Sequence, residues 1–239
     1  MLTSSKPLKD VFFCPEESNF YSHCIETLVL NNCVGSESII EFGSGDGIPV
    51  INSLLRKSFD GVVIHGFEVN DLACETANSK IKQSGINDNY IIHNRSLFDS
   101  SKPNAQYLIS NPPYLPALDN KIYQPLLHGG IDGITVSKQL VSLDYENVLL
   151  MISSYSNPEG LIDYAITKGY CTSNFLVSPL NFGYYSSEPK VMNRILELRT
   201  NKMAFYSKNV YLLAGVLFTK QQKAKVDLSN ELVQLMTSL

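Results

Sequence analysis

Short apolar runs alternate with amphipathic stretches along most of this chain of 239 residues. Seven of the runs have the length and composition of buried strands. They cover residues 38–42, 61–67, 90–92, 105–110, 147–152, 171–177 and 210–218. Apolar side chains recur at helical spacing within residues 19–30, 51–55, 71–83, 133–143, 161–167, 191–198 and 228–239. The pattern therefore predicts strands and helices in alternation.

This alternation predicts an α/β fold: a Rossmann-like, doubly wound, mostly parallel seven-stranded sheet with helices on both faces and an antiparallel last strand. We expect a single domain over residues 1–239, with residues 1–35 as a helical N-terminal lead-in. Residues 178–208 interrupt the alternation. We interpret them as an insertion before the last strand that contacts a substrate or a second copy of the chain.

Composition narrows the function classes. Hydrophobic residues make up 44% and charged residues 18% of the chain, as in ordinary globular proteins. A net charge of −4 and an isoelectric point near 5.6 argue against a nucleic-acid partner. The five cysteines contain no C-x-x-C pair, and His65, His93 and His128 show no metal-ligand spacing, so we expect no metal. No signal-peptide core or membrane-spanning run is present in the sequence, which predicts a cytoplasmic protein.

A glycine-rich segment, Glu41-Phe42-Gly43-Ser44-Gly45-Asp46-Gly47, follows the first predicted strand. Glycine takes positive φ without steric cost, and the helix after the segment offers unpaired amides to a ligand. Ile48 stands where a dinucleotide-binding G-x-G-x-x-G segment has its third glycine. An acid followed by G-x-G-x-G is instead typical of S-adenosylmethionine (SAM) sites, where glycines meet the amino-acid part of the cofactor. We therefore expect cofactor contacts from Glu41, Gly43, Gly45, Asp46 and Gly47, an ordinary glycine-rich turn being the alternative.

Glu68 ends the second predicted strand. In an open α/β sheet, an acid at this carboxyl edge can accept hydrogen bonds from both ribose hydroxyls of a nucleoside. A surface carboxylate is the alternative interpretation. Together with the glycine-rich segment, Glu68 is predicted to bind the cofactor.

The third motif is Asn111-Pro112-Pro113-Tyr114, which follows the apolar run 107–109 and Ser110. Two consecutive prolines end a central strand and leave a carboxamide, free carbonyls and an aromatic ring at its tip. Hydrogen bonds from an acceptor amine or amide to the Asn111 side-chain oxygen and the Pro112 carbonyl would favour a pyramidal, nucleophilic nitrogen. Tyr114 would stack on the planar group, and Pro113 would border it. Asn111, Pro112 and Tyr114 are predicted to be catalytic, and a proline-rich turn is the alternative.

Taken together, these motifs resemble the class I SAM-dependent methyltransferases, and among them the HemK/PrmC-like family of glutamine-amide methyltransferases. The resemblance covers residues 12–177 and resumes at 211–220. It implies that Asn111 also borders the cofactor. Residues 12–20, with Pro15, look like the family's segment that closes over the cofactor before the first helix.

The resemblance also implies two further contacts. Gly130 lies in a segment, 129–133, that is similar to the family's Gly-Gly-x-x-Gly loop and is expected to border the substrate. Ser96 stands where many relatives have an Asp that faces the adenine amine, and Leu97 is expected to pack on the base.

The resemblance leaves the methyl acceptor open. Too few residues precede the first strand for the N-terminal domain of the bacterial release-factor enzymes, so the layout is closer to short members that work with an activator subunit. We interpret the chain as an enzyme that N-methylates a planar amide or amine, with a protein glutamine as the acceptor. The alternative acceptors are a small-molecule or peptide natural product and the adenine amine of DNA or RNA. A non-catalytic SAM-binding subunit is the alternative to an enzyme, and a homodimer is the alternative to a complex with an activator subunit.

Overall fold

The computed structural model describes residues 11–56, 61–99 and 104–239. The chain divides into two compact units, Met1–Ala105 and Gln106–Leu239, which are described in turn. The single domain over residues 1–239 stays a prediction, and residues 1–10 of the predicted lead-in lie outside the described residues.

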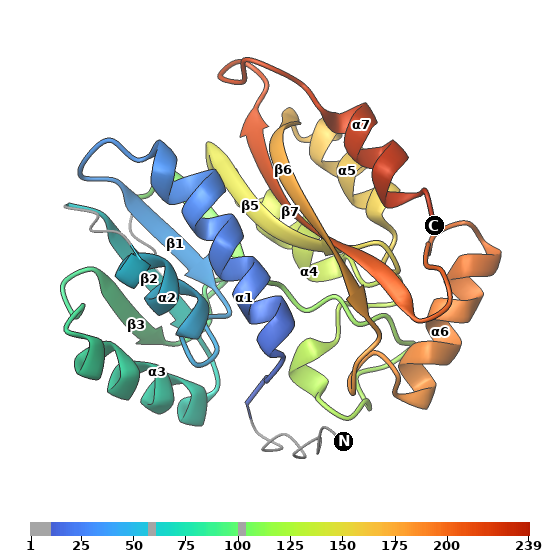
Figure 1. Ribbon diagram of the computed structural model, residues 1–239, viewed down its shortest axis with the longest axis horizontal. Helices are drawn as coiled ribbons and strands as arrows, with labels where there is room; N and C mark the ends of the chain where they lie inside the picture. Colours follow the sequence, from blue (N-terminus) through green and yellow to red (C-terminus); the bar gives the residue numbers. More distant parts are fainter. Residues whose placement is uncertain (1–10, 57–60, 100–103) are drawn as a thin grey trace. The chain divides into compact units, whose positions relative to one another are not determined.

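In the first unit, three parallel strands carry the predicted cofactor residues. Strand β1 (Ser38–Phe42) pairs with β2 (Val63–Glu68), and β2 pairs with β3 (Tyr90–Asn94). Helix α2 (Ile48–Arg56) packs against both α1 (Pro15–Cys24) and α3 (Asp71–Ser84) on one side of these strands (Figure 1). Helix α3 begins and ends as the sequence predicts, because Asn70 caps its first turn and Gly85, at a φ of +69°, ends it.

Helix α1 begins earlier than the predicted range 19–30. It starts at Pro15 and continues into a π-helical turn, Ile25–Val29. Proline is favoured at the first helical position, where its missing N–H is not needed, and Glu16 and Glu17 follow it in the first turn, where acids are stabilising. The expectation that residues 12–20 lie before the first helix is therefore wrong for residues 15–20.

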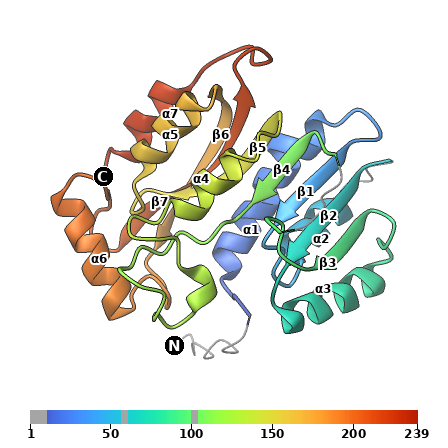
Figure 2. The same ribbon diagram turned by 180° about the vertical axis from the view of Figure 1, so that it is seen from behind.

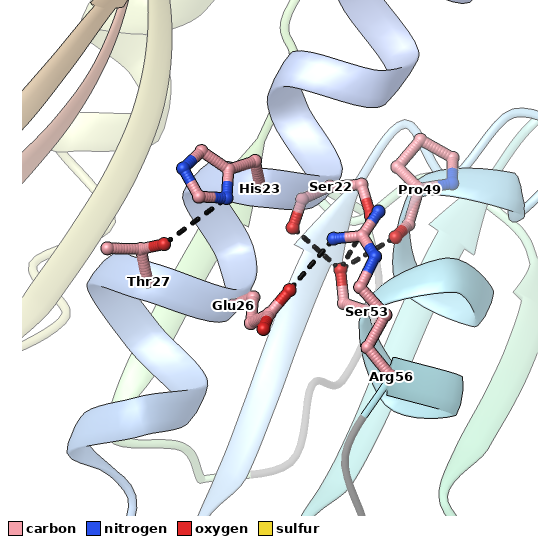
Figure 3. A network of polar contacts seen from close by, with 7 residues as sticks. All are labelled: Ser22, His23, Glu26, Thr27, Pro49, Ser53 and Arg56. Carbon is pink, nitrogen blue, oxygen red and sulfur yellow. Dashed lines mark hydrogen bonds and ion pairs between the residues drawn. The ribbon is translucent and has the colours of Figure 1, made fainter.

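A buried polar network fastens α1 to α2 (Figure 3). The Ser22 and Ser53 hydroxyls, both fully buried, lie 3.0 Å apart, and Ser53 Oγ lies 2.7 Å from the Pro49 carbonyl. Arg56 donates to Ser22 Oγ and forms a 2.8 Å ion pair with Glu26. Because serine is small, the two helices approach closely here, and every hydroxyl still has a partner. The network holds α1 on the helix that follows the glycine-rich segment.

In the second unit, β4 (Tyr107–Ser110) pairs in parallel with β5 (Asn147–Ser153). Strand β7 (Val210–Lys220) is antiparallel to both β5 and β6 (Tyr170–Asn181). Helices α4 (Thr135–Val141), α5 (Pro158–Thr167) and α7 (Ser229–Met236) cover one face of β5–β7 (Figure 2). The apolar side chains of β5 and β7, nearly all of them buried, form a large part of the core of this unit.

Strand β6 is longer than predicted, because residues 178–181 continue it and pair with residues 210–213 of β7. The rest of the predicted insertion holds α6 (Pro189–Thr200) between the two strands. Across the described residues, the strand order is β3-β2-β1 in the first unit and β4-β5-β7-β6 in the second. The predicted Rossmann-like, mostly parallel fold with an antiparallel last strand is confirmed.

Candidate functional site

The glycine-rich segment after β1 has a backbone that only glycine adopts readily. Gly43, Gly45 and Gly47 have φ values of +71°, +55° and +74°. A Cβ at Gly43 or Gly45 would meet no atom within 4 Å, whereas at Gly47 it would lie 3.2 Å from both Ala77 and Tyr90. The first two glycines therefore leave open space beside the backbone, and the third permits close packing.

Glu68, at the end of β2, is tied to this segment. Its Oε2 accepts a 2.9 Å hydrogen bond from the Gly45 N–H. Its Oε1 accepts from the N–H groups of Val69 and Asn70, each at 2.9 Å. A carboxylate offers about four lone-pair positions. Three are used by the backbone, so the structure brings Glu68 and the glycine segment together and leaves one position on Oε2.

Glu41 lies beneath the segment, and only 1% of its surface is exposed. Tyr90 donates a short hydrogen bond to its Oε2, and Tyr21 of α1 donates to Oε1 at 3.4 Å. Burial raises the pKa of Glu41 to about 7, against the lowering effect of the hydrogen bonds from Tyr90 and Tyr21. Burial and the neighbouring Glu41 also raise the pKa values of both tyrosines well above their usual range, so they remain O–H donors.

The raised pKa of Glu41 predicts a pH-dependent stability. Between its ordinary pKa of 4.5 and about 7, the folded chain holds a proton that the unfolded chain releases. The stability from this proton is complete below about pH 4.5 and is lost as the pH rises through about 7. Relative to Glu41→Gln, the wild-type free energy of unfolding should fall by on the order of 3 kcal/mol over this range, measured by urea denaturation. Parallel pH curves for wild type and Glu41→Gln, with exposed Glu75→Gln as control, would contradict it.

Two residues that hold this arrangement are missed by the sequence analysis. Tyr90 reaches Glu41 from β3, and nothing in the spacing of the sequence connects the two. Gly66 lies in β2, and a Cβ there would lie 2.3 Å from Ser44 Oγ and 3.0 Å from Tyr90. A glycine inside a strand is a signal for such a close approach, and here it makes room for the glycine segment.

The structure gives less direct support for the cofactor contacts expected of Asp46, Ser96 and Leu97. Asp46 accepts from the Ile48 N–H at the start of α2 and forms a 2.7 Å ion pair with Lys80. Ser96 is partly exposed after β3, and Leu97 is buried, with 2% of its surface exposed. Phe98 is the more accessible apolar side chain, and its ring lies 5.2 Å from that of Phe42. The cofactor contacts expected of these three residues stay predictions.

In the second unit, Asn111 follows β4 directly. Its side-chain oxygen Oδ1 is buried and has no hydrogen-bond partner among the described residues. A buried acceptor without a donor costs about 1–3 kcal/mol of stability, so such atoms are rare in folded proteins. The strand ends here as predicted, because Pro112 and Pro113 have no N–H to donate to a sheet.

The predicted Gly-Gly-x-x-Gly loop packs on the Asn-Pro-Pro-Tyr segment. The Gly129 N–H donates to the Leu115 carbonyl at 3.0 Å, and the Ala117 N–H donates to the Gly130 carbonyl at 3.1 Å. A Cβ on Gly129 would lie 2.6 Å from Tyr114 Cα, so a larger residue does not fit. Gly130 has a φ of +94° and packs on Thr135. The structure thus brings these two sequence-predicted segments together.

Ser156 completes this arrangement and is missed by the sequence analysis. Its hydroxyl, after β5, donates to the Tyr114 carbonyl at 2.7 Å. The Tyr114 ring is buried and meets the edge of the Tyr155 ring, with centroids 6.0 Å apart. Tyr114 is therefore held on both its backbone and its ring. A serine in a loop carries no signal that would reveal this contact in advance.

No family model matches this chain. No curated protein matches it either. Solved structures do: the [4+2]-cyclase SpnF aligns with a TM-score of 0.52 at 9% identity, covering 85% of this chain and 80% of that one. The magnesium protoporphyrin IX methyltransferase ChlM from Synechocystis aligns with a TM-score of 0.52 at 11% identity, covering 84% and 79%. The chain has a Rossmann-like methyltransferase fold.

A third similar structure is a putative sarcosine dimethylglycine methyltransferase from Galdieria sulphuraria, with a TM-score of 0.50 at 12% identity and 86% of both chains covered. At such low identity the likeness shows the fold and nothing finer. Because SpnF is a cyclase, this fold alone does not decide the reaction. Among the described residues, no helix is long and apolar enough to cross a membrane.

Proposed function

We propose that this chain is a SAM-dependent N-methyltransferase that acts on a planar amide or amine, with a protein glutamine side chain as the acceptor. The observation that carries the proposal is the buried, unpartnered Oδ1 of Asn111 at the end of β4. An acceptor oxygen left without a donor is explained if an N–H group of a substrate supplies one.

The residues of the first unit fit the cofactor. Open space beside Gly43 and Gly45 suits close approach of a ligand to the backbone. The remaining lone-pair position of Glu68 suits one ribose hydroxyl, and the protein backbone uses the other three. Phe42 and Phe98 offer a partly exposed aromatic surface of the kind that packs on a base. When bound, SAM supplies a methyl group on a positively charged sulfur, which leaves as a neutral thioether.

The second unit supplies what the accepting nitrogen needs. An amide nitrogen is a poor nucleophile because its lone pair is delocalised. Accepting its N–H at Asn111 Oδ1 favours a pyramidal nitrogen whose lone pair forms the new N–C bond, and stabilises the positive charge that develops. The nitrogen then loses a proton to water. Tyr114, held by Ser156 and Tyr155, borders the planar group and fixes its orientation.

Two measurements test the proposal in sequence. Isothermal titration calorimetry with SAM should show one binding site per chain, and absence of binding would overturn it. Incubation with methyl-labelled SAM and fractionated lysate should then place label in protein, as N-methylglutamine after hydrolysis and mass spectrometry. Label in small molecules, or in RNA or DNA, would keep the methyltransferase and replace the acceptor. Binding without any transfer would indicate a non-catalytic subunit.

We also propose that residues 178–208 help to bind the acceptor. The Tyr184 ring lies 5.4 Å from that of Tyr123, and Glu188 accepts a 2.6 Å hydrogen bond from the Tyr123 N–H. Arg194 Nε donates to the Ile131 carbonyl at 2.8 Å. The segment is thus anchored on residues 123–131, which end in the glycine loop beside Tyr114. This continuity supports a shared role.

If so, Tyr184→Ala should lower the rate of transfer at limiting acceptor about fivefold while leaving SAM affinity unchanged. Tyr184 is a suitable probe because 54% of its surface is exposed, so its removal opens no cavity. Initial rates at several acceptor concentrations separate an increased KM from a reduced kcat. Leu235→Ala, a half-exposed side chain on α7, is the control. An unchanged KM in Tyr184→Ala would argue that the segment is only structural.

A further inference from the structure

Two histidines that lie 28 residues apart in the sequence face each other in the first unit. In the parallel register of β2 and β3, Phe67 is opposite His93 and His65 is opposite Ile91. His65 and His93 are therefore diagonal neighbours on one face of the strand pair. His65 Nδ1 lies 3.1 Å from His93 Nε2, and both side chains are half-buried.

Packing restricts both rings. The His93 ring stacks on Phe67 with centroids 4.8 Å apart and an interplanar angle of 25°. Its other neighbour is His65, with ring centroids 5.3 Å apart and an angle of 29°. Phe67 thus covers one face of the His93 ring while His65 meets its edge, and the two facing nitrogens are placed before any ligand arrives, which lowers the entropic cost of binding one.

The charge state of His65 and His93 suits coordination of a metal ion. Burial lowers the pKa of His65, and burial, His65 and Arg95 lower that of His93. The Arg95 guanidinium lies over the Phe67 ring, 5.6 Å from its centroid. At neutral pH both imidazoles are therefore neutral, which is the form that coordinates a metal.

We propose that His65 Nδ1 and His93 Nε2 form a two-ligand site for a divalent transition-metal ion of the Ni²⁺, Cu²⁺ or Zn²⁺ type. An ion about 2.0–2.1 Å from each nitrogen, at their 3.1 Å separation, would subtend an angle of about 100°, between the octahedral and tetrahedral values. Imidazole is a ligand that all three ions accept.

The site has two protein ligands only. Within the described ranges, no group of three or more His, Cys, Asp or Glu side chains could hold a metal ion. Water fills the remaining positions, so the ion exchanges readily. Without metal, one ring donates an N–H to the other; on binding, that proton is transferred through water to the outer nitrogen of the same ring, which stays neutral. The positive charge of Arg95 opposes the ion and weakens the site. The inference is independent of the proposed function.

The test uses the full chain without a histidine tag. Isothermal titration calorimetry with Ni²⁺ at pH 7.5 should show one ion per chain. His65→Ala and His93→Ala should each weaken binding at least about tenfold. His23→Ala is the matched control, because His23 is exposed and its Nδ1 lies 3.5 Å from Thr27 Oγ1.

A second measurement guards against variants that do not fold. Electron paramagnetic resonance of one equivalent of Cu²⁺ on the wild-type chain should show coupling to two imidazole nitrogens. Loss of that coupling in His65→Gln and His93→Gln, with thermal melting unchanged without metal, would support the site. Equal Ni²⁺ affinity in both alanine variants, or no saturable binding to the wild type, would overturn it and leave the pair as a hydrogen bond.

Discussion

Asn111→Ala is expected to lower methyl transfer by about 10²–10³-fold while leaving SAM affinity nearly unchanged. The side-chain oxygen is the group that we propose accepts the N–H of the reacting nitrogen, and it is buried without a partner among the described residues. Initial rates with labelled SAM measure the first effect, and calorimetry measures the second.

The same substitution makes a prediction on stability that separates a catalytic from a structural role. A structural asparagine loses hydrogen bonds when it is truncated, and the protein is destabilised. Here the removed oxygen carries a desolvation cost of about 1–3 kcal/mol, so the free energy of unfolding should be unchanged or higher. Exposed Asn104→Ala is the control for both measurements. Loss of activity together with a marked loss of stability would assign Asn111 to the fold.

Glu68→Ala should lower SAM affinity about 100-fold or more. The carboxylate holds the N–H groups of Gly45, Val69 and Asn70, and we propose that it also accepts a ribose hydroxyl. Each hydrogen bond to a charged group contributes about 1.5–3 kcal/mol, so losing the ribose contact and loosening the glycine segment together account for an effect of this size. Calorimetry with S-adenosylhomocysteine gives the affinity without turnover.

A ligand without ribose hydroxyls distinguishes the direct contact from the indirect one. A dideoxyribose analogue of S-adenosylhomocysteine should bind the wild type more weakly than the parent compound, and the two should bind Glu68→Ala equally. Glu75→Ala, an exposed acid on α3, serves as the control. If the wild type does not discriminate between the two ligands, Glu68 acts only by holding the loop.

The features that were predictable depend on local backbone chemistry. Positive φ at Gly43, Gly45 and Gly47 and the αL end of α3 at Gly85 follow from residue type alone, because only glycine adopts these angles cheaply. Two prolines end β4 wherever the strand lies in the sheet. Alternating apolar and amphipathic runs were enough to predict the class of fold.

Boundaries were less predictable where two local signals compete. The apolar spacing in residues 19–30 favoured a late start for the first helix, whereas Pro15 at its first position and two acids after it gave α1 its start. Strand β6 extends to Asn181 because its last residues pair with residues 210–213 of β7. This pairing is a tertiary interaction, so the sequence of β6 alone does not predict it.

What the sequence by itself determined is the type of each element, the turns between them and the kinds of group at the strand ends. Only the tertiary structure decided which groups meet: Tyr90 with Glu41, Gly129 with Tyr114, Ser156 with the Tyr114 carbonyl, and His65 with His93. Local structure depends on interactions over a few residues, which spacing reveals. These pairs join segments tens of residues apart, and their contact depends on strand pairing and side-chain packing, for which a single sequence carries no periodic signal.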